Sequence, residues 1–250
     1  MSRNGRDIAQ MTPLKKGKYS ARLVGGDADM QAVLALRVQC FGSAGGAEDR
    51  FDAAAQQVVV CEGATDQIVA AFRMSVLRPS QLSSSYASQY YDIRALEHFG
   101  GLLLELGRFC IHPEYHDPDI LRLAWAALTA HVDRTGIKLL FGCASFQGTD
   151  PAPYQDAFAL LKARHLAPEQ WRAQQKAVEV YPYAATLQSA PDLGRATASM
   201  PPLLRTYLMM GGWVSDHAVI DRDLGTLHVF TAVEIDAIPP ARKRLLRALV

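Results

Sequence analysis

The stretch LLLELGRFCI, residues 102–111, decides the fold class of this chain. It is apolar except at Glu105 and Arg108, and a nearly continuous apolar run of this length is typical of a central strand covered on both faces. Because burying an unpaired charge is costly, the two ionisable residues indicate either a structural ion pair or a functional site.

The spacing of these two charges predicts an irregular strand. Residues three apart in a flat strand face opposite sides of the sheet, whereas a bulge near Gly107 would turn Glu105 and Arg108 toward one cavity. A bulge also leaves a backbone N–H unpaired. A carboxylate beside such an N–H suits acyl transfer to an amine, because the carboxylate takes the ammonium proton and the N–H polarises the acyl carbonyl.

The elements around this strand predict an α/β fold. In chain order we expect a strand at 19–24, a helix at 27–41, a hairpin of strands at 57–61 and 68–77, the strand at 102–111, a helix at 120–134, a strand at 138–143, a helix at 153–165, a short helix at 201–210, and strands at 213–220 and 227–235. This order predicts a mixed β-sheet flanked by helices on both faces, with a bulged central strand.

Composition excludes several classes of protein. The 250 residues are 49% apolar and 20% charged, which excludes a disordered chain, and no run of eighteen apolar residues predicts a membrane span. The first twenty residues lack the apolar core of a secretory signal, so we expect a cytoplasmic protein. Four widely spaced cysteines show no metal-type spacing and are expected to be reduced, buried thiols.

The net charge of +1 conceals two basic ends. Residues 1–22 carry a net +5 and residues 241–250 a net +4, which leaves −8 for the rest. We therefore expect a basic N-terminal extension over 1–17, one domain over 18–238, and a basic amphipathic helix over 239–250. That helix either packs on the domain or lies on an anionic membrane surface. Nucleic-acid binding is not expected, because the basic ends have no interleaved aromatic residues and no recognised motif.

Several common sites are missing from the sequence. It contains neither GxxxxGK[ST] nor GxGxxG, so no ordinary nucleotide cradle is predicted. The stretch GCASF (142–146) has Phe where a nucleophile elbow needs Gly. His112, Glu114 and His116 lie in a proline-punctuated loop without the fixed geometry of a metal site, so no metal is expected there.

Three longer motifs carry a resemblance to a known family. They are ELGRFCIHPxY (105–115), LFGCASFxGTDP (140–151) and MPPLLRxYLxxG (200–211). The chain resembles the L-ornithine Nα-acyltransferases of ornithine-lipid synthesis over roughly residues 20–235, and its element order resembles the GCN5-related N-acetyltransferase (GNAT) fold. The resemblance implies transfer of a 3-hydroxyacyl group from acyl carrier protein to the α-amine of L-ornithine, giving lyso-ornithine lipid.

A more distant resemblance to the acyl-homoserine-lactone synthases implies the site residues. In those enzymes a charged cluster surrounds the amino-acid substrate. It implies catalytic roles for Glu105 and Arg108, and the matching substrate-binding positions here are Arg37, Asp49, Asp52 and Arg73. Ser145, in the second of the three motifs, is a further expected substrate-binding residue. Glu105 is the expected base or proton relay, Arg108 or Arg73 would hold the α-carboxylate, and Asp49 and Asp52 would take the δ-ammonium. Cys110, Ile111 and His112 are the expected contacts of the donor's pantetheine arm. For Arg37, Asp49, Asp52 and Arg73, a purely stabilising ion network remains the alternative.

One departure from the GNAT pattern bears on the acyl donor. Members of that fold usually carry a glycine-rich turn that binds the coenzyme A pyrophosphate at a helix N-terminus. Here residues 116–120 (HDPDI) have no glycine and two acids, which would repel a pyrophosphate. We therefore expect no separate cofactor, with the phosphopantetheine thioester of acyl carrier protein as donor.

Two other functions remain open from the sequence. One is a carrier-protein-dependent N-acyltransferase that acts on another amino acid. The other is a non-catalytic module that binds acyl carrier protein, and the retention of Glu105 and Arg108 argues against it.

Overall fold

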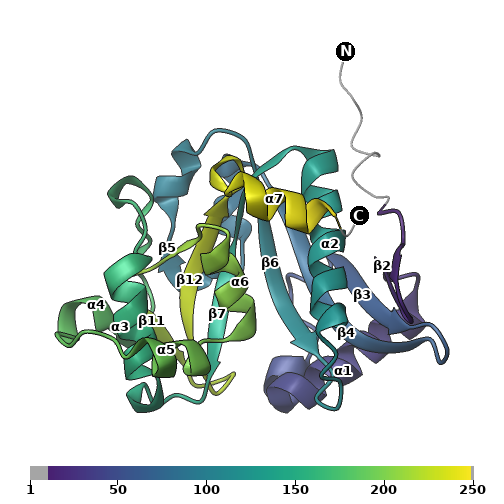
Figure 1. The fold of residues 1–250 in the computed structure, drawn as a ribbon, viewed down its shortest axis with the longest axis horizontal. Helices are drawn as coiled ribbons and strands as arrows, with labels where there is room; N and C mark the ends of the chain where they lie inside the picture. The colour runs from purple at the N-terminus through teal and green to yellow at the C-terminus, as the bar shows by residue number, and fades with distance from the viewer. Residues whose placement is uncertain (1–10, 249–250) are drawn as a thin grey trace. The chain divides into compact units, whose positions relative to one another are not determined.

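The computed structural model describes residues 11–248, which divide into two compact units. Of these residues, the first unit holds 11–75, 107–137 and 240–248, and the second holds 76–106 and 138–239. The division falls inside two strands, β4 (Gln67–Leu77) and β6 (Leu102–Ile111), so the chain passes through both units more than once (Figure 1). The first ten residues of the expected extension and the last two of the C-terminal helix lie outside the described residues.

The first unit is built on antiparallel strands. β1 (Leu14–Lys16) pairs with β2 (Tyr19–Leu23), β2 with β3 (Gln56–Glu62), and β3 with β4 in the predicted hairpin. The end of β6 runs antiparallel to β4, since the backbone N–H of His112 donates to Val69 O at 2.8 Å. Valine-rich β3 is buried through its centre, as its composition predicts.

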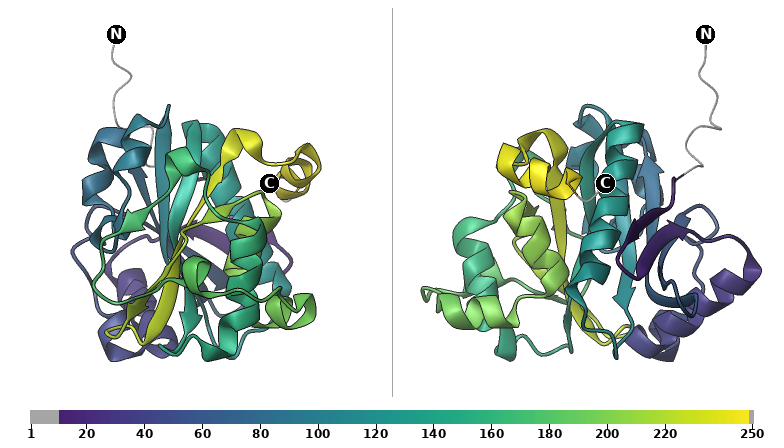
Figure 2. Two further views of the ribbon diagram at one scale, coloured as in Figure 1. Left: turned by 90° about the vertical axis from the view of Figure 1, so that its left-hand side faces the viewer. Right: turned by 45° about the vertical axis from the view of Figure 1, so that its right-hand side comes forward.

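Helices cover both faces of these strands. α1 (Asp27–Gly46) packs Val33 and Leu36 against Val59 and Cys61 of β3. α2 (Pro118–Thr135) contacts β1, β2 and β3 and lies over β1 and β2 in the right-hand view of Figure 2. Because alternate strand residues face opposite sides, α2 covers the face of β3 that α1 leaves. α7 (Pro240–Arg247) contacts α2.

The second unit contains a mixed sheet. β7 (Ile137–Gln147) pairs antiparallel with β12 (Thr226–Glu234), and β12 pairs with both β10 (Trp213–Val214) and β11 (Ala218–Asp221), which in turn pairs with β9 (Val180–Tyr181). β6 and β7 run parallel, since Gly101 approaches Lys138 and Leu106 approaches Gly142. At Gly142 a Cβ would lie 2.4 Å from Leu106 O, so only glycine allows this contact.

Short elements complete the second unit. α3 (Gln155–Arg164) packs on α5 (Leu193–Ser199), and α6 (Pro202–Met209) packs on β12 (Figure 1). The remaining pieces are α4 (Tyr183–Thr186), the pair β5 (Tyr91–Asp92) and β8 (Gln174–Gln175), and 3₁₀ turns at Pro79–Ser84, Ala87–Gln89, Arg94–His98, Ala152–Tyr154, Glu169–Trp171 and Ile235–Ala237. The core of this unit gathers Leu103, Phe141, Trp213 and Phe230 around the buried Tyr91.

The main predicted elements are confirmed, with several differences. The helix expected over 27–41 continues to Gly46, but its geometry breaks at Gly42, where φ is 75°. The single strand expected over 213–220 is wrong, because residues 215–217 interrupt it and leave β10 and β11. The short helices α4 and α5 were not predicted. Among the helices described between residues 11 and 248, none is long and apolar enough to cross a membrane.

Candidate active site

The first unit brings together five of the predicted site residues. Arg37 comes from α1, Arg73 from β4 and Arg108 from β6, while Asp49 and Asp52 lie in the turn that follows α1. Hydrogen bonds and ion pairs connect all five into one network, which we call the charged cluster. The arginine–aspartate bonds of the cluster join residues that are 15 to 59 positions apart in the sequence, so only the fold assembles it.

The innermost pair of the charged cluster is fully buried. Arg37 donates to both carboxylate oxygens of Asp52 at 3.0 Å, and the two side chains are 0% and 1% exposed. Gln57 closes the arrangement, accepting from Arg37 at 2.8 Å and donating to Asp52 at 2.9 Å. Gln57 was not predicted as a member; its only signal is a polar residue at the start of a valine-rich strand. This part of the cluster has the character of the stabilising ion network.

The outer part of the cluster is closer to solvent. Arg73 donates to Asp52 at 3.0 Å and to Asp49 at 2.5 Å. Arg108 donates to the other Asp49 oxygen at 3.0 Å and to Gly45 O at 2.6 Å. The Asp49 side chain is 21% exposed, so the cluster reaches the surface of its unit at this residue.

Backbone distortion in β6 allows this arrangement. Arg108 adopts a φ of 52°, a left-handed conformation that interrupts a regular strand, one residue after the predicted bulge position at Gly107. At Gly107 itself an added Cβ would lie 3.1 Å from Arg73 Nε. Glycine therefore lets the Arg73 side chain cross β6 toward the aspartates.

The arginines keep both aspartates ionised. Burial alone would raise the pKa of Asp49, but the hydrogen bonds from Arg73 and Arg108 bring that pKa below its usual value. Burial likewise opposes ionisation of Asp52, and the backbone N–H of Asp49 together with Arg37 and Arg73 lowers the pKa of Asp52. Three guanidinium groups against two carboxylates give the cluster one excess positive charge, which favours an anionic ligand such as a carboxylate.

Glu105 lies in the second unit and is held by a loop. Its two carboxylate oxygens accept the backbone N–H groups of Tyr86 at 2.9 Å and Ala87 at 2.7 Å, and the residue is 5% exposed. These donors begin the 3₁₀ turn at 87–89, in the serine-rich segment after β4. The carboxylate therefore has a fixed orientation.

The remaining predicted residues lie at two separate places. In the first unit, Cys110 Sγ is 3.7 Å from Ala71 O, Ile111 O accepts from Cys40, and His112 N is already bonded to β4. A pocket of about 300 Å³ follows, lined by Ile111, His112, Pro113, Tyr115, His116, Asp117, Pro118 and Leu121, at the start of α2. In the second unit, Ser145 is an exposed residue of β7 opposite His228.

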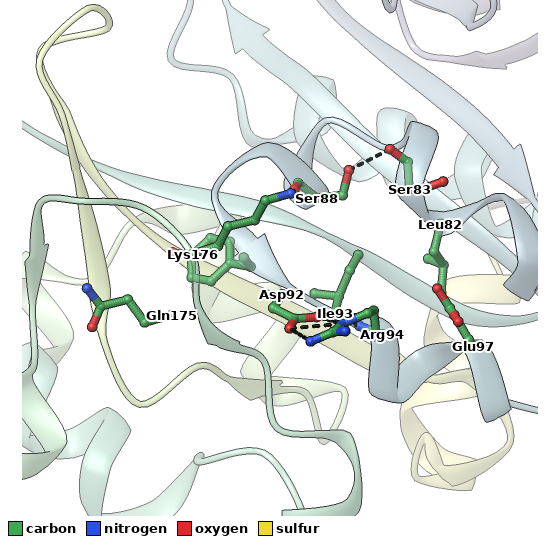
Figure 3. A pocket seen from close by; sticks show the side chains of 10 residues that line it. Leu82, Ser83, Ser88, Asp92, Ile93, Arg94, Glu97, Gln175 and Lys176 are labelled. Carbon is green, nitrogen blue, oxygen red and sulfur yellow. Dashed lines mark hydrogen bonds and ion pairs between the residues drawn. The ribbon is translucent and has the colours of Figure 1, made fainter.

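A second pocket, of about 400 Å³, opens on the loop that holds Glu105 (Figure 3). Lys176 reaches across to Ser88, donating to its carbonyl at 2.6 Å, while Arg94 pairs with Asp92. No predicted site residue lines this pocket. Over residues 11–248, no three His, Cys, Asp or Glu side chains gather in a way that could hold a metal ion.

Comparisons with known proteins agree with the fold. A family model described as an acetyltransferase (GNAT) domain matches residues 37–126, from Arg37 of the charged cluster into α2. An L-ornithine N(alpha)-acyltransferase of Rhodobacter capsulatus is 34% identical over 196 residues, covering 76% of this chain and 75% of its own length. A second L-ornithine N(alpha)-acyltransferase, from Brucella abortus, is 31% identical over 249 residues, covering 89% of this chain and 86% of its own length. Among solved structures, FeeM, an N-acyl amino acid synthase, aligns over 90% of this chain and 93% of its own at 12% identity and a TM-score of 0.47, a likeness too low to add to these matches.

Proposed function

This chain belongs to the L-ornithine N(alpha)-acyltransferase family, and we propose that it acylates the α-amine of L-ornithine with a 3-hydroxyacyl group taken from acyl carrier protein. The product would be lyso-ornithine lipid. The observation that carries the proposal is the likeness to two relatives of that name over three quarters or more of the chain. The charged cluster adds a physical reason, since its excess positive charge suits the α-carboxylate of an amino acid.

The proposed reaction is a direct attack of the amine on the thioester. The ornithine ammonium loses a proton, its nitrogen forms a bond to the acyl carbon, and the carbon–sulfur bond breaks. The nitrogen loses a second proton as the amide forms, and the departing sulfur takes one of the two. Glu105 is the candidate base or proton relay, and Arg108 or Arg73 is the candidate partner of the α-carboxylate. No step needs a covalent bond to the enzyme, so the four cysteines, all free, take no part.

A mass spectrum of the product tests this proposal. The enzyme is incubated with 3-hydroxyacyl carrier protein and, in parallel, with ornithine, lysine or glutamine. We expect an N-acylated product with ornithine. A product with lysine or glutamine alone would favour the acyltransferase acting on another amino acid. Binding of carrier protein without any product would favour the non-catalytic module.

We predict that acyl carrier protein is preferred over coenzyme A as carrier of the same acyl group. At the start of α2 the Asp117 side chain accepts from Asp119 N at 2.9 Å, and Asp119 binds Arg122 at 2.8 Å and Lys16 at 3.3 Å. The resemblance to the GNAT fold implies that a pyrophosphate would bind at this helix start, beside Asp117 and beside an Asp119 that is already paired with two cations. A repulsion of 1.4 kcal/mol already corresponds to a factor of ten, so kcat/KM should favour carrier protein by more than about tenfold.

Steady-state kinetics with both donors measures this preference. Asp117→Asn keeps an oxygen for the helix cap and removes one negative charge. It should therefore raise kcat/KM for the coenzyme A donor and reduce the preference for carrier protein. Glu114→Gln, in the preceding loop, provides a matched loss of one charge away from the helix start. Equal kcat/KM for the two donors in the unaltered enzyme would show that the acidic turn does not select the donor.

The C-terminal helix has a separate prediction. α7 contacts α2 through Arg247, which binds Asp133 at 2.7 and 2.8 Å, so packing on the domain has direct support. Leu245 is 61% exposed and Arg244 is exposed beside it, which is what contact with a lipid surface would use. We propose that this helix also gives weak, salt-sensitive binding to anionic membranes, at about 1 kcal/mol per basic residue.

Co-sedimentation with vesicles decides between the two roles. The full chain should sediment with anionic vesicles at low salt, and neither with neutral vesicles nor at high salt. A chain that ends at Ile238 should lose that binding. Equal binding by both chains, or by neither, would mean that the helix only packs on the domain.

A further inference from the structure

Two buried polar atoms face each other in the second unit with no hydrogen-bond partner. They are Nε2 of His228, on β12, and Oδ2 of Asp221, on β11, and they lie 4.0 Å apart. His228 is 1% exposed and Asp221 is 5% exposed. Oγ1 of Thr226, which is the register partner of Asp221, is also buried without a partner. A buried polar atom left unpaired is costly, so this gap calls for an explanation.

The hydrogen bonds of Tyr91 determine which ring nitrogen of His228 carries the proton. The Tyr91 hydroxyl has one hydrogen and donates it to His228 O at 2.7 Å. The same oxygen lies 3.2 Å from His228 Nδ1, so that contact needs the hydrogen on Nδ1. In the neutral ring Nε2 is then an acceptor.

Burial keeps the His228 ring neutral. Burial, together with a smaller contribution from the neighbouring His217, lowers the pKa of His228 to about 4. Around neutral pH, Nε2 therefore presents a lone pair to the Asp221 carboxylate. Two acceptors facing each other at 4.0 Å cannot satisfy each other, and a donor group between them would bond to both.

The space between His228 Nε2 and Asp221 Oδ2, which we call the gap, lies near an exposed residue of β7. Ser145 is directly opposite His228 in the β7–β12 pair, so both side chains are on one face, and Ser145 is exposed. Cys143 lies two residues before Ser145. Cys143 also follows Gly142, which approaches Leu106 O, so Glu105 of β6 lies on the strand next to this part of β7. The gap is thus close to the candidate base.

We propose that His228 Nε2 and Asp221 Oδ2 form the subsite for the distal ammonium of the amine substrate. A primary ammonium has three N–H donors and one positive charge. It can donate to both acceptors and to Thr226 Oγ1, and it neutralises Asp221. A metal ion fits less well, because the described residues bring no third His, Cys, Asp or Glu to this pair. The inference rests on the proposed function and identifies what would select ornithine.

The charged cluster is a poorer place for that ammonium. Both Asp49 oxygens and both Asp52 oxygens already accept hydrogen bonds from arginines, and Asp52 is buried. An ammonium placed there would meet the excess positive charge of the cluster. Asp221, by contrast, accepts from Leu224 N at 3.0 Å and interacts with the Tyr90 hydroxyl, while its Oδ2 has no hydrogen bond and no arginine beside it among the described residues.

The test compares L-ornithine with L-norvaline, which has the same carbon chain without the δ-amine. With acyl carrier protein as donor, kcat/KM of the unaltered enzyme should be higher for ornithine by at least about 30-fold, the usual minimum for a lost partner in a buried charge pair. Asp221→Asn keeps the bond to Leu224 N and should remove most of that preference by raising KM for ornithine. Asp223→Asn, an exposed residue in the same hairpin turn, should leave it unchanged.

The outcomes separate the inference from the proposed function. Equal kcat/KM for ornithine and norvaline in the unaltered enzyme would overturn the subsite and leave N-acylation standing, with water as the occupant of the gap. That comparison can overturn the subsite even if Asp221→Asn does not fold. An unchanged preference in a folded Asp221→Asn, with a lost preference in Asp49→Asn, would return the ammonium to the charged cluster. Acylation of neither amino acid would overturn the proposed function itself.

Discussion

Replacing Glu105 with alanine is expected to lower turnover by about 10²–10⁴-fold, the usual contribution of a positioned acid–base group, while the protein still folds. The carboxylate is held by two backbone N–H groups of the 86–87 loop and is nearly buried, so its position is fixed before substrate binds. Fixed orientation is what a base needs if it is to meet the attacking amine without reorganising.

The Glu105 contacts also suggest a competing role as an anchor for that loop, and a second variant separates the two. Glu105→Gln keeps one oxygen acceptor for the loop but cannot take a proton. If Glu105 is the base, both variants lose turnover, whereas an anchoring role alone would leave Glu105→Gln close to normal. Glu169→Ala, an exposed glutamate in the same unit, is the control and should keep normal kinetics. Normal turnover in Glu105→Ala with an unchanged melting curve would remove Glu105 from the mechanism.

The charged cluster shows what the sequence could predict. Its five members were identified by resemblance, and the irregular strand was expected because Glu105 and Arg108 are three residues apart in an apolar run. Their mutual contacts could not be predicted, because α1, β4 and β6 meet only through long-range packing. Gln57 was missed for the same reason. A polar residue near the start of a strand is common, and only the structure shows that it accepts a hydrogen bond from Arg37.

The second unit was harder to predict. The partners of Glu105 are backbone N–H groups, which no side-chain pattern can indicate, and they lie in a serine-rich segment expected to be a loop or a short helix. Asp221 and His228 are in strands whose other residues are mostly apolar, and a lone polar residue there is usually satisfied by a neighbour. Only the register of β11 with β12 and the tautomer set by Tyr91 show that Asp221 and His228 face each other without a hydrogen bond between them.

Arg37→Met is expected to have the largest effect on stability of the substitutions considered, lowering the free energy of unfolding by about 3–5 kcal/mol. Methionine fills much of the space but leaves the buried Asp52 carboxylate without the arginine that bonds both of its oxygens. Arg73 still donates to one of these oxygens, so the negative charge of Asp52 remains partly compensated. Urea unfolding measures the change, and Arg164→Met, at the exposed end of α3, should stay within about 0.5 kcal/mol.

The double variant Arg37→Met, Asp52→Leu tells a structural pair from a substrate-binding one. If the two charges mainly satisfy each other, removing both should cost less than the sum of the single changes, with a coupling of about 0.5–3 kcal/mol. Arg73 and Arg108, still held by Asp49, would remain to bind an amino-acid carboxylate, so KM for ornithine should change little. A folded Arg37→Met with normal stability and a strongly raised KM would mean instead that this arginine contacts the substrate. The burial of both side chains favours the first result, and we then expect any substrate contact at the outer, partly exposed end of the cluster.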